Sequence, residues 1–173
     1  MDRLTDALHS FRCCLDSDIE DFLQNKAITF LRRRWCSVYL LVDEQEFEQG
    51  HIKIDAYFTL SHKTLIPAED TSKTKIKETS GLNDSASIHF VLIRQLGKPI
   101  ERLEDGTLSS ADIGSKEILD EAFAVIQESS DLIPCRCVLV ECSDNPKVHK
   151  VYEDYHFKYF QFDGEHHQYY KKL

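Results

Sequence analysis

The chain has 173 residues, is 42% hydrophobic and carries a formal net charge of −9 at pH 7. This length and hydrophobic content predict a single globular domain over residues 1–173, and the acidic balance argues against a broadly basic nucleic-acid surface. No apolar run approaches the roughly 20 residues that a membrane span needs, and the N-terminal segment MDRLTDALHS lacks the apolar core of a signal peptide. We therefore expect a cytoplasmic protein with no membrane partner.

The N-terminal half predicts one helix followed by two strands. Asp16, Ser17 and Asp18 suit the start of a helix, apolar residues recur at helical spacing after them, and the basic run at residues 32–34 suits a helix C-terminus. Residues 36–42 form a continuous β-rich run, and residues 43–50 are a polar connection. Residues 51–66 alternate in polarity, which predicts a long strand or a strand with a bulge and completes a hairpin.

The middle of the chain predicts a loop, a strand and a helix. Residues 67–85 are polar and predict a surface loop with at most one helical turn. Residues 87–96 predict a strand that ends before Gly97 and Pro99. Residues 115–128 carry an apolar face at helical spacing and predict a helix.

The stretch CRCVLVECSDNPKVHKVYEDYHF, which begins at Cys135, predicts a buried strand, a tight loop and a short helix. Residues 137–140 are an uninterrupted apolar run, and Asp144 or Asn145 can cap a helix that starts at Pro146. The Asp-Gly pair at residues 163–164 suits a type I′ turn and predicts a C-terminal hairpin.

The six cysteines are not spaced like a disulfide framework or a zinc site, because they form no paired CxxC and no Cys/His set. We expect reduced, buried thiols and no metal site. His166 and His167 are adjacent in a predicted strand, so their side chains point to opposite faces and cannot easily hold one metal. We assign them no role. The cysteines are Cys13, Cys14, Cys36, Cys135, Cys137 and Cys142.

Asn145 directly follows the predicted central strand, and Tyr152 opens the phrase Y-E-D-Y-H-F seven residues later. Asn145, Tyr152, Glu153 and Phe157 resemble a motif of the GCN5-related N-acetyltransferase (GNAT) family, and His156 stands where that family usually has Gly. A helical Tyr considered in isolation is more often a core residue with its hydroxyl at the rim.

A second set of residues, in the N-terminal third, carries a more specific resemblance. The pattern F-x-C, a helix with F-L-x-x-x-A and the phrase Y-F-T-L-S resemble the opening of a GNAT subgroup that includes toxins of toxin-antitoxin pairs. Cys14 stands where that subgroup has Gly. Together the motifs extend over nearly the whole chain. The matching residues are Phe11, Cys13, Phe22, Leu23, Ala27, Tyr39, Leu40, Leu41 and Tyr57 to Ser61.

The resemblance implies a mixed α/β fold, with a central, mostly antiparallel sheet, splayed middle strands and flanking helices. It also implies transfer of the acetyl group of acetyl-CoA to a primary amine, with the Tyr152 hydroxyl as the general acid that protonates the leaving thiolate. Asn145 would contact the pantetheine arm. The backbone groups expected to pair with pantetheine like an added strand belong to Leu92, Ile93, Arg94 and Gln95.

The phosphate loop that the resemblance implies is only partly present. Against the family pattern Q/R-x-x-G-x-G/A, Ser109 and Asp112 replace the first two residues, and only Gly114 is kept. Asp112 would repel a pyrophosphate, and a plain capped helix explains the same segment. The groups expected to bind coenzyme A are the backbone N–H groups of Ile113, Gly114, Ser115 and Lys116, together with the Lys116 ammonium.

The acceptor and the activity itself stay open in the sequence. The acceptor is a small amine, a protein or, as toxin-like relatives imply, an aminoacyl-tRNA, although dense basic clusters occur only at residues 32–34 and 73–77. No general base is assigned: Glu141 is a candidate by position, but a structural carboxylate is the better interpretation. The resemblance also implies a homodimer and an antitoxin partner. The alternative is a non-catalytic GNAT-fold scaffold or partner-binding module.

Overall fold

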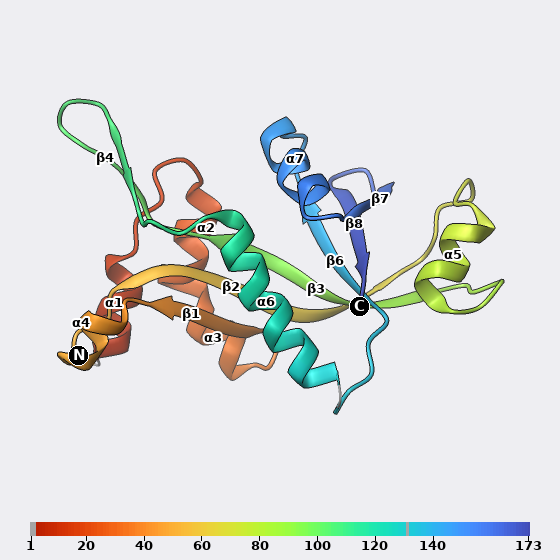
Figure 1. The fold of residues 1–173 in the computed structure, drawn as a ribbon, viewed down its shortest axis with the longest axis horizontal. Helices are drawn as coiled ribbons and strands as arrows, with labels where there is room; N and C mark the ends of the chain where they lie inside the picture. The colour runs from red at the N-terminus through yellow and green to blue at the C-terminus, as the bar shows by residue number, and fades with distance from the viewer. Residues whose placement is uncertain (1–2, 131) are drawn as a thin grey trace. The chain divides into compact units, whose positions relative to one another are not determined.

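The computed structural model of the chain describes residues 3–130 and 132–173 (Figure 1). The chain divides into two compact units. The first unit comprises residues 1–60 and 95–118, and the second comprises residues 61–94 and 119–173.

Six strands form a mixed sheet in the hydrogen-bonded order β1-β2-β3-β6-β8-β7. The ladders β1–β2, β6–β8 and β7–β8 are antiparallel, whereas β3–β6 is parallel. The mostly antiparallel sheet that the resemblance implies is therefore confirmed. The strands are β1 (Ser37–Val42), β2 (Ile54–Leu65), β3 (Ile88–Gly97), β6 (Cys137–Cys142), β7 (Lys158–Phe162) and β8 (His167–Lys172).

The first unit is built on a run of helices that packs on β1 and β2. Asp16 caps α2, because its Oδ1 accepts hydrogen bonds from the backbone N–H groups of Asp18 and Ile19. The helix expected after Asp16 is confirmed, with one turn in π geometry. Tyr57 of β2 is fully buried in this core and donates its hydroxyl to the Ile19 carbonyl at 2.7 Å. The helical segments are α1 (Arg3–Ser10), α2 (Ser17–Asp21), the π-helix η1 (Phe22–Lys26) and α3 (Ala27–Arg32).

Besides α1, two short helices and one hairpin were not expected from the sequence. The polar connection after β1 contains α4 (Glu44–Glu48), and the polar loop after β2 contains α5 (Lys73–Ser80). Each has a side-chain cap, Asp43 on α4 and Ser72 on α5, but neither is long enough to show a clear apolar period. The hairpin of β4 (Ile100–Arg102) and β5 (Leu108–Ser110) extends as an arm in Figure 1.

The second unit is centred on β6. Residues 137–140 are completely buried, and β6 is a central strand, paired with β3 on one side and with β8 on the other. A strand buried in this way requires the continuous apolar run that the sequence shows. The expected helices follow the sequence closely: α6 is Ser115–Ser130 and α7 is Pro146–Asp154.

The C-terminal hairpin is confirmed, but its turn differs from the expected type. Residues 163–166 separate β7 from β8, so the loop has more residues than a type I′ turn provides. The Asp163 carboxylate accepts hydrogen bonds from the N–H groups of Glu165 and His166, and Gly164 has a φ of 97°. Side-chain capping by Asp163 therefore stabilises the longer loop.

All six cysteines are free, as expected, but only Cys13, Cys137 and Cys142 are buried. Cys14 is exposed, which corrects the expectation of uniformly buried thiols. Among the described residues, no helix has both the length and the apolar character needed to cross a membrane.

Candidate active site

The junction of β6 and α7 is the most ordered part of the candidate site. Asn145 is the N-cap of α7: its Oδ1 accepts a hydrogen bond from the Lys147 N–H at 3.1 Å, and Pro146 occupies the first helical position. Of the two residues that could cap this helix, the structure therefore selects Asn145. Its acceptor oxygen is occupied by the cap, whereas its exposed amide NH₂ still offers a donor to a ligand.

Tyr152 lies on α7 and is only 9% exposed. Its ring contacts Phe157 and Tyr169, with centroids 5.6 and 6.1 Å away. Among residues 3–130 and 132–173, no group hydrogen-bonds to its hydroxyl, and the oxygen is not among the fully buried unpaired atoms. A buried side chain held by aromatic packing thus keeps a hydroxyl to which no described residue hydrogen-bonds.

The protonation state of Tyr152 suits a proton donor. Burial, and to a smaller extent the nearby Cys142 thiol, raises the pKa of the Tyr152 phenol above its ordinary value. Removal from water disfavours the phenolate, so the hydroxyl keeps its proton at neutral and moderately alkaline pH.

Glu141 is engaged in a polar network and is not a free base. Its Oε1 accepts hydrogen bonds from Lys63 Nζ at 2.5 Å and from Gln168 Nε2 at 2.7 Å. Gln168 is fully buried and also donates to Asp163 at 3.0 Å. The structural role preferred for Glu141 agrees with these contacts, which tie β6 to β2 and β8 within the second unit.

The four β3 residues expected to contact pantetheine lie at the end of the β3–β6 ladder and just beyond it. The parallel pairing of β3 with β6 runs over residues 91–93, so Leu92 and Ile93 are paired with Leu139 and Val140 and are buried. Arg94 lies beyond the last registered pair and is exposed. In the first unit, the Gln95 N–H donates to Thr59 Oγ1 at 3.1 Å. A role for these residues in binding pantetheine stays a prediction.

The candidate phosphate loop lies in the first unit, at the N-terminus of α6. The Glu117 carboxylate accepts a hydrogen bond from the Gly114 N–H at 2.5 Å, as the third residue of a capping box does. An internal anion therefore occupies one of the N–H groups expected to bind pyrophosphate. Asp112 is exposed and does not make this contact.

Two further features define the surroundings of this loop. The Lys98 ammonium donates to the carbonyls of Ala111 at 3.1 Å and Ile113 at 2.8 Å, which fixes the backbone before α6. The charged side chains that line a pocket of the same unit are mostly acidic, which disfavours an anionic ligand there. Its charged lining residues are Asp43, Lys53, Asp55, Glu101 and Asp112.

The sequence matches no protein-family model and no curated protein. The fold, in contrast, is found in solved structures. A structure described as AtaT complexed with acetyl-methionyl-tRNAfMet superposes with a TM-score of 0.71 at 20% identity, over 95% of this chain and 86% of that one. AtaTR bound with AcCoA gives a TM-score of 0.68 at 20% identity, with the same coverage of both chains. The chain has the GNAT acetyltransferase fold.

A third GNAT-fold structure supports the same assignment. It is a Tyr-to-Phe mutant of KacT, and it superposes with a TM-score of 0.67 at 16% identity, over 94% of this chain and 85% of that one. At these identities, the similarity establishes the GNAT fold, and the roles of individual residues rest on this chain's own geometry.

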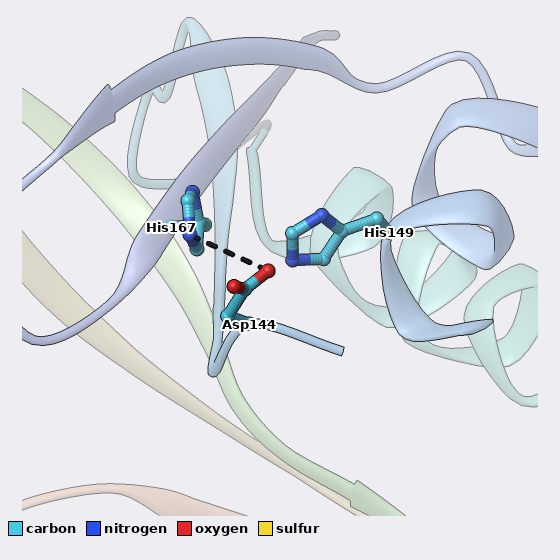
Figure 2. Close-up of side chains that lie close together, drawn as sticks. All are labelled: Asp144, His149 and His167. Carbon is cyan, nitrogen blue, oxygen red and sulfur yellow. Dashed lines mark ion pairs between the residues drawn. The ribbon is translucent and has the colours of Figure 1, made fainter. Parts of the chain in front are cut away.

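One side-chain cluster on this GNAT fold was missed by sequence reasoning. His167 of β8 lies beside His149 of α7 and the Asp144 carboxylate, which precedes α7 (Figure 2). Asp144 and His149 are close in sequence, but His167 belongs to β8, and the β6–β8 ladder brings it beside them. Residue spacing carries no signal for this cluster, because its two histidines belong to different elements.

Proposed function

We propose that the chain is an acetyltransferase that moves the acetyl group of acetyl-CoA to a primary amine, with Tyr152 as the general acid. The observation that carries the proposal is the Tyr152 phenol, which is buried and protonated but has an unpaired hydroxyl among the described residues. The GNAT fold supports it, since AtaTR has been solved with AcCoA and AtaT with an acetylated aminoacyl-tRNA.

The chemistry requires one bond to form and one to break. The neutral amine attacks the thioester carbonyl, the new C–N bond forms, and the C–S bond breaks as the thiolate of coenzyme A leaves. Tyr152 donates its proton to that sulfur and is reprotonated from solvent, while the amine nitrogen releases a proton to water. Glu141 has no part in this step, because Lys63 and Gln168 already hold it.

Cofactor binding would use groups from the segments named above. Asn145 would donate its amide to the pantetheine arm, and the β3 backbone from Leu92 to Gln95 would align that arm. The N–H groups of residues 113–116 and the Lys116 ammonium would hold the pyrophosphate. The Glu117 carboxylate competes for one of these N–H groups, so we expect weak binding of acetyl-CoA.

The test compares Tyr152→Phe with Tyr159→Phe. Tyr159 is 44% exposed, so the same loss of a hydroxyl there has no reason to affect the reaction. We expect Tyr152→Phe to lower kcat by about 100-fold or more, the usual worth of general-acid catalysis, and to leave the affinity for acetyl-CoA unchanged. Turnover is measured with a panel of amines and charged tRNA, as transfer of the radiolabelled acetyl group of acetyl-CoA to the acceptor and as release of free coenzyme A. Equal turnover in the two variants would overturn the role of Tyr152.

A second candidate function is a non-catalytic scaffold, which the loop at Gly114 favours because Glu117 already occupies it. A scaffold would show no turnover with any acceptor, and Tyr152→Phe would change nothing measurable.

For the acceptor of the proposed acetyltransferase, we propose aminoacyl-tRNA first, since AtaT has been solved with an acetylated one. The Arg33 Cζ lies 4.8 Å from the centroid of the exposed Trp35 ring. Together the two side chains offer a small cationic and aromatic surface for a nucleic acid. Binding of charged tRNA should then weaken steeply with salt.

A further inference from the structure

Asp144, His149 and His167 present three metal-binding groups to one point in the second unit (Figure 2). One potential ligand atom from each residue lies within 4.8 Å of the other two. The His167 Nε2 and the Asp144 Oδ1 are 3.9 Å apart, and the two imidazole centroids are separated by 4.8 Å. Imidazole nitrogen and carboxylate oxygen are ordinary ligands of zinc.

We propose that Asp144, His149 and His167 form a binding site for a divalent transition metal ion, with Zn²⁺ as the best fit. Ligand atoms around a tetrahedral zinc ion lie about 3.3 Å from one another, given bonds of roughly 2.0–2.1 Å. The observed spacing is slightly wider, so the three side chains must draw together. Three protein ligands would leave a fourth position for water or another small ligand.

The surrounding structure fixes two of the ligands and leaves the third adjustable. His167 is held in place by the ring of Phe162, whose centroid lies 4.8 Å away, and its backbone is paired with Cys142. His149 is carried by α7, whose first turn is fixed by the Asn145 cap. The Asp144 side chain is 86% exposed, so it can rotate toward the two imidazoles without disturbing the core.

Metal binding has one identifiable cost. The His149 Nε2 lies 3.1 Å from the Ser143 carbonyl, a contact that an Nε2–H tautomer makes as a hydrogen bond. A metal on this nitrogen would displace that proton and the hydrogen bond. The exposed carbonyl can then be solvated by water, so the loss is smaller than for a buried group.

The contacts that indicate the metal site do not depend on acetyl transfer, so its test does not use turnover. Metal-free protein, with its thiols kept reduced by a phosphine, is titrated with Zn²⁺ by calorimetry, and the Tm is followed in parallel. We expect about one ion per chain and a Tm that rises with Zn²⁺ concentration. Asp144→Asn, His149→Gln and His167→Asn should each weaken binding about tenfold or more, whereas the control His166→Gln should leave it unchanged.

Two outcomes would overturn the proposal. One is Zn²⁺ binding of unchanged affinity in Asp144→Asn. The Asp144 side chain is largely exposed, so this substitution should not unfold the protein. The other is a cobalt-loaded protein whose near-ultraviolet spectrum shows strong thiolate charge-transfer bands, because that would assign the metal to cysteines. We expect the cobalt-loaded protein to show weak visible bands and no thiolate bands. These visible bands should be lost in His167→Asn and kept in His166→Gln.

Discussion

At the scale of single residues, the Glu117 carboxylate would compete with the pyrophosphate of coenzyme A for the Gly114 N–H. A helix N-terminus attracts anions because its first N–H groups have no partner in the helix. Here the Glu117 carboxylate accepts the Gly114 N–H at 2.5 Å, so a side chain of the protein itself fills part of that role. Repulsion of a pyrophosphate by Asp112 stays a prediction, and Glu117 adds a second carboxylate, in direct contact with the Gly114 N–H.

Removing the negative charge of Glu117 should therefore improve cofactor binding. Glutamine at this position can still accept the Gly114 N–H, so Glu117→Gln keeps the helix cap. We expect acetyl-CoA to bind roughly two- to fivefold more tightly, as a single charge near a helix terminus contributes about 0.3–1 kcal/mol. Calorimetry checks the affinity, with Glu121→Gln as the control one turn later. An unchanged affinity in Glu117→Gln would show that pyrophosphate does not bind at this terminus.

Asn145 combines a structural and a proposed binding role in one side chain. Its oxygen caps α7, while its amide NH₂ is the group proposed to contact pantetheine. These roles can be separated, because serine is as good an N-cap as asparagine but has no amide.

We expect Asn145→Ala to lower the free energy of unfolding by about 1 kcal/mol and to raise the KM for acetyl-CoA. Asn145→Ser should keep wild-type stability yet show the same increase in KM. Chemical denaturation and steady-state kinetics measure the two effects. If Asn145→Ser behaves like the wild type in both, the side chain acts only as a cap.

At the scale of elements, α7 carries the side chains on which both proposals depend, Tyr152 for acetyl transfer and His149 for the metal site. Beyond its cap, it is fixed at its C-terminal end by Tyr155, whose hydroxyl donates to Asp120 of α6 at 2.6 Å. Tyr155 also lies beneath the Lys171 ammonium, at 4.0 Å from the ring centroid. These contacts, all within the second unit, hold the helix that carries both His149 and Tyr152.

The elements that could be predicted from the sequence are those determined by local signals. The strand β6 and the helix α7 were predicted because an apolar run, a capping residue and Pro146 are adjacent in the chain. The short strands β4 and β5 were missed because all but one of their residues are exposed, so no burial pattern marks them. The cluster at His149 and His167 depends on strand pairing, which residue spacing does not encode.

At the scale of the whole molecule, fold and function are supported differently. The GNAT fold rests on superposition over nearly the entire chain, and the sequence motifs near Phe11 and Tyr152 had already implied it. Activity depends on whether a chain with a formal net charge of −9 and an altered phosphate loop still binds an anionic cofactor.

Calorimetric titration of the purified protein with acetyl-CoA tests that question most directly. We predict saturable binding in the micromolar range. Binding should be weaker in Lys116→Met, which lacks the Lys116 ammonium, and stronger in Glu117→Gln. Heat that stays at the level of dilution up to millimolar acetyl-CoA would contradict the acetyltransferase proposal and leave the scaffold as the function to pursue.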